Sequence, residues 1–330
     1  MNDIRLGNTG LRVSRLCLGT MTFGYQCDEP LAYRILDRAA EHGISFIDTA
    51  DCYPLTPDPV ENGRTEEIVG RWLRGRRDGV VLATKCNLAM GPAAWQQGNS
   101  RRHIMDAIDA SLRRLKTDYV DLYQLHFPDP DTPIDETLRA LDDLVRCGKV
   151  RYIGVSNFPA WRLARAIGRA EVLGCAPLAS AQPRYNLLFR EFERDLLPMC
   201  AEEGVAVIAY NPLAGGLLSG KHRGAQGPLA GTRFTLDKTG ERYRERYWQE
   251  RQLQAVETLA GVADEAGIPL PQMAIAWLLS KPAVTAPIIG ATRPEQLDAG
   301  LAALAQPLDS ELVARLDEVT AEFRRGDAQR

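Results

Sequence analysis

The feature that most restricts the fold is a repeated alternation of a short apolar run with an amphipathic helical segment. The apolar runs lie at Arg15–Leu18, Ser45–Asp48, Val80–Lys85, Val120–Leu125, Val150–Val155, Leu178–Ala181, Val205–Ala209 and Ala286–Ile289. Helical patterns between them include Leu31–Glu41, Thr65–Arg74, Arg102–Leu115, Glu136–Cys147, Trp161–Leu173 and Phe192–Glu203. Nearly continuous apolar strands are typical of a parallel sheet that is buried on both faces. About eight right-handed crossovers close such a sheet, so we predict an α/β fold, a (β/α)8 TIM barrel.

The ends of the chain extend this prediction. The segment Leu6–Leu11 contains two glycines and indicates an N-terminal β-hairpin that plugs the bottom of the barrel. C-terminal helices are expected after the last strand. No Ser/Gly linker divides the 330 residues, and barrels of about 250 residues grow by loop insertion. We therefore expect a single barrel domain over residues 1–330.

Composition excludes several classes of function. The formal net charge of -3 gives no long-range attraction to nucleic acid or to an anionic membrane. No stretch approaches the roughly 20 apolar residues that span a bilayer. The seven cysteines form no C-x-x-C pair and no metal-like cluster with histidine, which is typical of reduced thiols. We expect a cytoplasmic protein that binds no metal.

Two connections are longer than a compact domain needs. One spans residues 53–62 and is rich in proline, and the other runs from 212 to about 245. Long loops in compact domains are usually binding loops or lids. Both follow strands, so both should lie on the C-terminal face, where barrel enzymes keep their active sites.

Polar side chains end three neighbouring strands on that face. Asp48, Lys85 and His126 each close an apolar run, and Tyr53 follows Asp48 in the next loop. Taken one at a time, they can be explained as a structural ion pair and a rim histidine. A carboxylate, an ammonium, an imidazole and a phenol at one face are harder to explain that way, because burying charge is costly. Such convergence indicates an active site.

Several segments, in the right order, resemble the aldo-keto reductase superfamily over nearly the whole chain. They are Leu16–Met21, Phe46–Tyr53, Val120–His126, Ile153–Phe158, Ala209–Leu213 and Gly216–Lys221. The resemblance implies NADPH-dependent reduction of an aldehyde or ketone, with Asp48, Tyr53, Lys85 and His126 as the catalytic residues.

The chemistry gives a reason for these four residue types. Hydride that arrives at a carbonyl carbon builds negative charge on oxygen, which needs a proton and hydrogen-bond donors. Tyr53 would be the general acid, and the resemblance implies that the Lys85 ammonium lowers its pKa. Asp48 would hold Lys85 in place. His126 would be a second donor to the carbonyl oxygen.

No G-x-G-x-x-G follows a strand, so the Rossmann fingerprint is absent. By resemblance, Ser156, Asn157 and Gln182 would hold the nicotinamide carboxamide, and Tyr210 would stack on the ring. The remaining cofactor candidates are Asn211, Pro212, Leu213, Lys221, Arg233, Gly290, Thr292, Arg293 and Gln296. Arg233 has the alternative of a solvated loop charge.

The segment after the last strand bears on the choice of cofactor. Thr292 and Arg293 stand at a helix start, which suits the 2′-phosphate of NADPH. The family usually has a Glu-Asn pair that contacts adenine, where this chain has Ala299-Gly300. That departure puts strict NADPH preference in question.

Aromatic residues on the top loops are candidates for the substrate pocket, with packing beneath the loops as the alternative. They are Phe23, Tyr25, Trp95, Phe127 and Tyr185. The partner would be a small carbonyl compound, and the loop at 54–62 resembles bacterial reductases of sugars and sugar nucleotides. Two other functions stay open. One is a non-catalytic NADPH-binding regulatory subunit, as in potassium channels, and the other is an aldolase that forms a Schiff base on Lys85.

Overall fold

The computed structural model describes residues 3–56, 58–224 and 227–325. Within these residues, eight parallel strands close into a barrel in the order β10-β3-β4-β5-β6-β7-β8-β9. The strands are β3 (Cys17–Gly19), β4 (Phe46–Asp48), β5 (Val81–Cys86), β6 (Val120–Leu125), β7 (Val150–Ser156), β8 (Leu178–Gln182), β9 (Ala206–Ala209) and β10 (Val284–Gly290). The predicted TIM barrel is confirmed.

The strands are apolar on both faces because each face meets a separate core. Cys17, Phe46, Ala83 and Leu122 point into the barrel and form one cluster with residues of the opposite strands. Their chain neighbours, such as Ile47, join the larger cluster between the strands and the helices. This alternation follows from the two-residue period of a strand.

An N-terminal hairpin fills the lower end of the barrel. Strands β1 (Asp3–Arg5) and β2 (Arg12–Ser14) pair antiparallel, and Leu6 is fully buried in the interior cluster. The turn approaches β9 so closely that a Cβ on Gly7 (φ +55°) would lie 2.4 Å from the carbonyl oxygen of Gly204. The predicted hairpin is confirmed at the predicted place.

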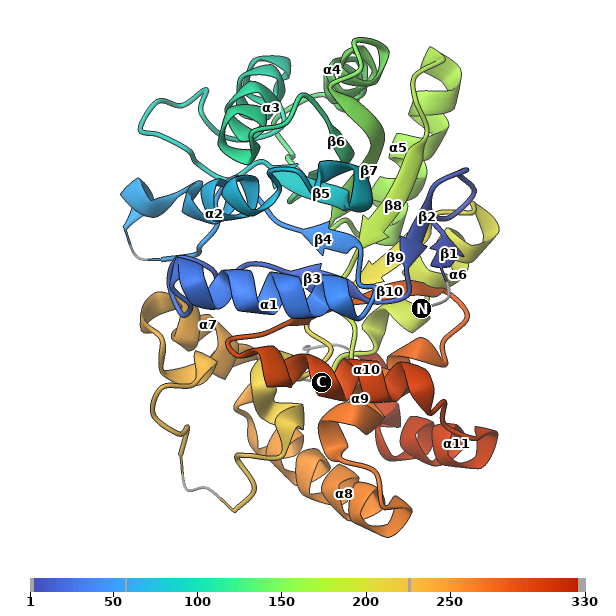
Figure 1. Cartoon of the computed structure of the whole chain (residues 1–330). Helices are drawn as coiled ribbons and strands as arrows, with labels where there is room; N and C mark the ends of the chain where they lie inside the picture. Colours follow the sequence, from blue (N-terminus) through green and yellow to red (C-terminus); the bar gives the residue numbers. More distant parts are fainter. Residues whose placement is uncertain (1–2, 57, 225–226, 326–330) are drawn as a thin grey trace.

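The helices surround the barrel (Figure 1). Those of the first six units are α1 (Glu29–Glu41), α2 (Arg64–Trp72), α3 (Arg101–Leu115), α4 (Ile134–Arg146), α5 (Ala160–Leu173) and α6 (Leu196–Glu202). The last differs from the helix expected over Phe192–Glu203. A separate 3-10 turn covers Glu191–Glu193, and α6 starts afresh where the Asp195 carboxylate accepts a hydrogen bond from the Leu196 amide.

The final third of the chain adds further helices. After β9 come α7 (Asp237–Tyr247), α8 (Glu250–Ala266) and α9 (Leu270–Leu279), and after β10 come α10 (Asp298–Ala305) and α11 (Ser310–Val319). Figure 1 shows α7 at the opposite end of the barrel from the hairpin. None of the helices in the described residues is both long enough and apolar enough to cross a membrane.

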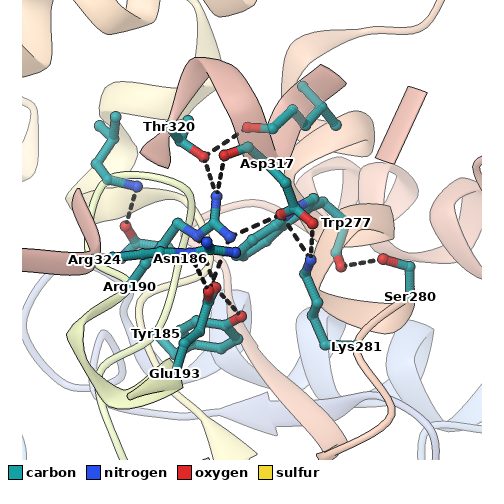
Figure 2. Close-up of polar contacts among 12 residues, drawn as sticks. Tyr185, Asn186, Arg190, Glu193, Trp277, Ser280, Lys281, Asp317, Thr320 and Arg324 are labelled. Carbon is teal, nitrogen blue, oxygen red and sulfur yellow. Dashed lines mark hydrogen bonds and ion pairs between the residues drawn. The ribbon is translucent and has the colours of Figure 1, made fainter. Parts of the chain in front are cut away.

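A buried ion-pair network fastens the C-terminal helix to the loop after β8 (Figure 2). The Arg190 side chain is fully buried and lies 2.7 Å from Glu193 and 2.9 Å from Asp317 of α11. Lys281 and the Trp277 indole also donate to Asp317, at 2.7 and 2.9 Å. The network replaces the water that these charges lose on burial.

Candidate active site

The carboxyl ends of the strands open into a cavity of about 1380 Å³. Its walls include Asp48 from β4, Ser156 from β7 and Gln182 from β8, together with the loops that follow these strands. The cavity lies where barrel enzymes place their chemistry.

A buried ion pair forms the floor of this cavity. Lys85 is fully buried and donates to Asp48 Oδ2 at 2.5 Å and to the Thr49 carbonyl at 2.8 Å. The other carboxylate oxygen of Asp48 accepts from the Gln182 amide at 2.9 Å and from the Gln124 amide at 3.3 Å. Because a carboxylate only accepts, this contact fixes the orientation of the Gln182 amide, with its NH2 toward Asp48.

Tyr53 and His126 lie on the cavity wall above this pair. Their ring centroids are 5.7 Å apart at an angle of 79°. The Lys85 Nζ lies 5.0 Å from the centre of the Tyr53 ring. The strand ends therefore bring together all four residues that the sequence analysis selected, three of them on the cavity wall and Lys85 just beneath.

The protonation of these groups differs in part from the expectation. Burial, followed by the nearby Asp48 carboxylate, raises the pKa of Tyr53 well above its usual value. The direction is opposite to the lowering that was expected from Lys85, because burial outweighs the nearby charges. Burial and then Lys85 lower the pKa of His126 well below its usual value, so the imidazole is neutral.

Asn157 connects three strand ends beside the four candidate catalytic residues. Its side-chain NH2 donates to the His126 carbonyl at 2.9 Å, and its Oδ1 accepts from the Tyr210 hydroxyl at 2.6 Å. Its backbone has φ +61°, a conformation in which asparagine is enriched. Ser156 donates to the Gln182 carbonyl at 2.9 Å. These four predicted residues form one connected group on the cavity wall.

A group of cations lies along another part of the cavity. Lys221 and Arg233 line it, and burial, then Arg233 and Arg293, lower the pKa of Lys221. Among the described residues, no ion pair joins any of these three cations to a carboxylate. Asn211, Pro212 and Leu213 of the same long connection also face the cavity.

The segment after β10 holds the remaining predicted cofactor residues. Gly290, Thr292 and Gln296 line the cavity. The Gln296 side-chain oxygen accepts from the Thr292 amide at 2.7 Å and from the Arg293 amide at 3.3 Å. The backbone amides of Thr292 and Arg293 therefore already have a hydrogen-bond partner within the chain. The exposed Arg293 side chain is the cation at this helix start.

A family model for the aldo/keto reductase family matches residues 15–321. The chain belongs to the aldo/keto reductase family. Uncharacterized oxidoreductase YrpG of Bacillus subtilis (strain 168) is 41% identical over 322 residues, 95% of this chain and 94% of that protein. Versiconal hemiacetal acetate reductase of Aspergillus parasiticus is 34% identical over 351 residues, 96% of each chain. A probable voltage-gated potassium channel subunit beta of Arabidopsis thaliana is 38% identical over 304 residues, 91% of this chain and 90% of that protein. The family and its oxidoreductase members support carbonyl reduction.

In this aldo/keto reductase, most of the aromatic residues expected in the substrate pocket lie elsewhere. Phe127 lines the cavity. Phe23 and Tyr185 are fully buried in the core, where the Tyr185 hydroxyl donates to Glu193 at 2.7 Å. Tyr25 and Trp95 are 39% and 52% exposed and are not part of the cavity wall. None of these four residues lines the cavity, because Phe23 and Tyr185 are covered by apolar neighbours whereas Tyr25 and Trp95 lie on the outer surface.

Sequence reasoning missed other residues of the site. Gln124 is fully buried in β6, and an amide in the middle of an apolar strand was the available signal. Cys52, which precedes Tyr53, lines the cavity with its Sγ 3.6 Å from His126 Nδ1. Arg242 and Arg246 of α7 line it too, but no strand-end pattern points to them.

Proposed function

We propose that this aldo/keto reductase reduces an aldehyde or ketone to an alcohol with NADPH, and that Tyr53 is the general acid. One observation carries the proposal. Tyr53 and His126 face each other on the cavity wall, directly above the buried Lys85–Asp48 pair. A carbonyl oxygen between the two rings would have a proton donor and a second hydrogen-bond donor.

The cavity has the chemistry to hold NADPH. Arg233 and Arg293 both lie close enough to Lys221 to lower its pKa, and phosphate groups would relieve that repulsion. The orientation of Gln182 leaves its side-chain oxygen for the carboxamide NH2. When bound, NADPH supplies the hydride that a carbonyl carbon accepts.

The protonation states suit reduction. The raised pKa keeps Tyr53 protonated at neutral pH. An alkoxide is more basic than an ordinary phenolate, and the phenol proton of Tyr53 is therefore assigned to the developing alkoxide.

We assign the tautomer of His126 from its contact with Cys52. Burial raises the pKa of the Cys52 thiol well above its usual value, so the sulfur is protonated. It lies 3.6 Å from Nδ1, and we assign the thiol as the donor and Nδ1 as the acceptor. The neutral ring then carries its proton on Nε2, the nitrogen that we assign to the carbonyl oxygen.

Two alternatives differ in what they ask of the site. An aldolase needs a free amine, whereas Lys85 is fully buried and bonded to Asp48 and Thr49. We therefore set this function aside. A non-catalytic NADPH-binding subunit is the second candidate, because the Arabidopsis relative is named as a potassium channel subunit.

The test is a screen of NADPH oxidation with aldehydes, ketones and keto-sugars, repeated with NADH. We expect turnover with NADPH and at least one carbonyl class. Tight NADPH binding without turnover of any carbonyl would favour the regulatory subunit instead. Borohydride treatment with substrate should leave no adduct on Lys85.

A further inference from the structure

Helix α7 turns one face toward the cavity. Thr239, Arg242, Tyr243 and Arg246 all line it, and their spacing of three, four and seven residues places them on one side of an α-helix. Thr239 also donates to the Leu55 carbonyl at 3.2 Å. This contact fixes α7 against the loop that follows Tyr53.

The two guanidinium groups on this face have no acidic partner in the described part of the chain. Among the residues that the structure describes, no ion pair involves Arg242 or Arg246. As a like-charged pair four residues apart, they slightly destabilise the helix. Arg244 of the same helix instead donates to the Phe234 carbonyl and is not part of the cavity wall.

The face of α7 that carries these arginines lies beside the reacting end of the cavity, because the Tyr243 hydroxyl donates to Asn211, the chain neighbour of Tyr210, at 3.3 Å. Burial raises the pKa of Tyr210 to about 12, and Arg246 is the first of the nearby charges that oppose the rise. Tyr210 and Tyr243 are both close enough to Tyr53 to affect its pKa. By contrast, the cations that act on Lys221 are Arg233 and Arg293. Arg242 and Arg246 thus belong to α7 and lie next to Arg233, whose guanidinium is 5.3 Å from the centre of the Tyr243 ring.

The net charge of the cavity wall is opposite in sign to the net charge of the whole chain. The chain has a formal net charge of -3. The ionised side chains on the cavity wall are the cations Lys221, Arg233, Arg242 and Arg246 and the anions Asp48 and Glu295. Asp48 is already paired with Lys85 beneath the wall. A positive cleft in an anionic protein concentrates anions at its mouth.

We propose that the carbonyl substrate carries an anionic group, a carboxylate or a phosphate, which Arg242 and Arg246 bind while its carbonyl lies between Tyr53 and His126. The proposal rests on the proposed function and names its substrate class. A guanidinium pair suits such a group because each fork donates two parallel hydrogen bonds to a carboxylate or phosphate.

The experiment compares matched substrates in the holoenzyme. One pair is 4-carboxybenzaldehyde and its neutral methyl ester, and the other is glyceraldehyde 3-phosphate and glyceraldehyde. The measured quantity is the ratio of kcat/KM for the anionic member to that for the neutral member. We expect a native ratio of about ten or more in at least one pair, since a charged hydrogen bond is worth about a factor of ten. The pair that shows it identifies the anion as carboxylate or phosphate.

Arg246→Gln should lower that ratio about tenfold, mainly through KM. Arg74→Gln is the matched control, because it removes the same charge from an exposed position outside the cavity, and it should leave the ratio unchanged. Retained NADPH affinity in Arg246→Gln shows that the variant is folded.

A native ratio near one in both pairs would overturn the proposal while leaving the proposed function intact, as would an unchanged ratio in Arg246→Gln. If neither member of either pair is reduced, the proposed function is judged by the wider carbonyl screen, and the anion site is tested by binding alone. Binding of 4-(hydroxymethyl)benzoate and its methyl ester to the NADP+-loaded protein then decides the anion site. Equal affinity for the two compounds would reject it.

Discussion

Behind the cavity lies a buried acidic residue, Asp51, that the proposed chemistry does not use. Asp51 is fully buried one residue before Cys52. Burial, followed by the Glu66 carboxylate, raises the pKa of Asp51 well above its usual value. Glu66 is itself held by Arg114 at 2.8 Å and by Thr84 at 2.6 Å. Asp51 therefore lowers the free energy of unfolding at every pH at which its carboxyl is ionised in the unfolded chain.

Asp51→Asn should stabilise the protein at neutral pH. A carboxyl whose pKa is raised on folding contributes stability below its unfolded pKa, and that contribution is lost as pH rises through the folded pKa. The amide removes this loss, so the gain should be largest near pH 7 and should vanish near pH 4, about the unfolded pKa. One unit of pKa is about 1.4 kcal/mol, and we expect a gain of at least that order. Thermal unfolding at the two pH values measures it, and an equal effect at both would contradict the explanation.

The residues that converge could be predicted from the sequence, whereas their protonation could not. Asp48, Lys85 and His126 end neighbouring strands, so strand order alone brings them together. The pKa of Tyr53 depends on burial, which no local pattern specifies. Phe23 and Phe127 look alike as loop aromatics, yet packing buries one in the core and leaves the other at the cavity.

Among the connecting elements, the segment after β10 is the one on which the proposed preference for NADPH over NADH depends. Gln296 caps the amides of Thr292 and Arg293, so a 2′-phosphate would have to be held by side chains. Gly300 packs tightly behind this segment, where a Cβ would lie 3.1 Å from Ile289. The glycine in place of the family's asparagine therefore suits the close approach of α10 to the barrel.

Arg293→Ala should weaken NADPH binding by about tenfold, the scale of one charged hydrogen bond. NADH lacks the 2′-phosphate, so its affinity should change little. Fluorescence titration of both cofactors measures the difference. Equal losses for NADPH and NADH would show that Arg293 does not recognise the 2′-phosphate.

Strands were easier to predict than the elements after β9. The predicted strand Val120–Leu125 agrees with β6, because its apolar run is bounded by polar turns. Helix α7 has a strongly polar sequence, and its inward face depends on Tyr243 and Tyr247, which are buried in the larger core cluster. The helix expected over Phe192–Glu203 is interrupted because Glu193 binds Arg190, a contact that a helical pattern does not reveal.

At the scale of the whole molecule, the ion-pair network of Figure 2 joins distant parts of the chain. Arg190 follows β8, whereas Asp317 lies in α11, and the two are 2.9 Å apart. The network is not part of the cavity wall, so it should support stability more than turnover.

Arg190→Met keeps much of the side-chain volume but leaves the Glu193 and Asp317 carboxylates without their shared partner. Breaking a fully buried ion pair on one side costs about 3–5 kcal/mol. The loss should be smaller here, because both carboxylates are partly exposed and keep a second cation, Arg324 or Lys281. We expect a lower unfolding midpoint in denaturant, with kcat/KM of the folded variant within about twofold of the native value. A variant as stable as the native protein would show that the network contributes little.

The most direct test of the central claim is Tyr53→Phe, which keeps the ring and removes only the hydroxyl. NADPH-dependent carbonyl reduction is measured as kcat/KM beside the dissociation constant of NADPH. We predict that kcat/KM falls about 100-fold or more, while the dissociation constant stays within twofold. Reduction at the native rate in this variant would contradict the assignment of Tyr53 as the general acid.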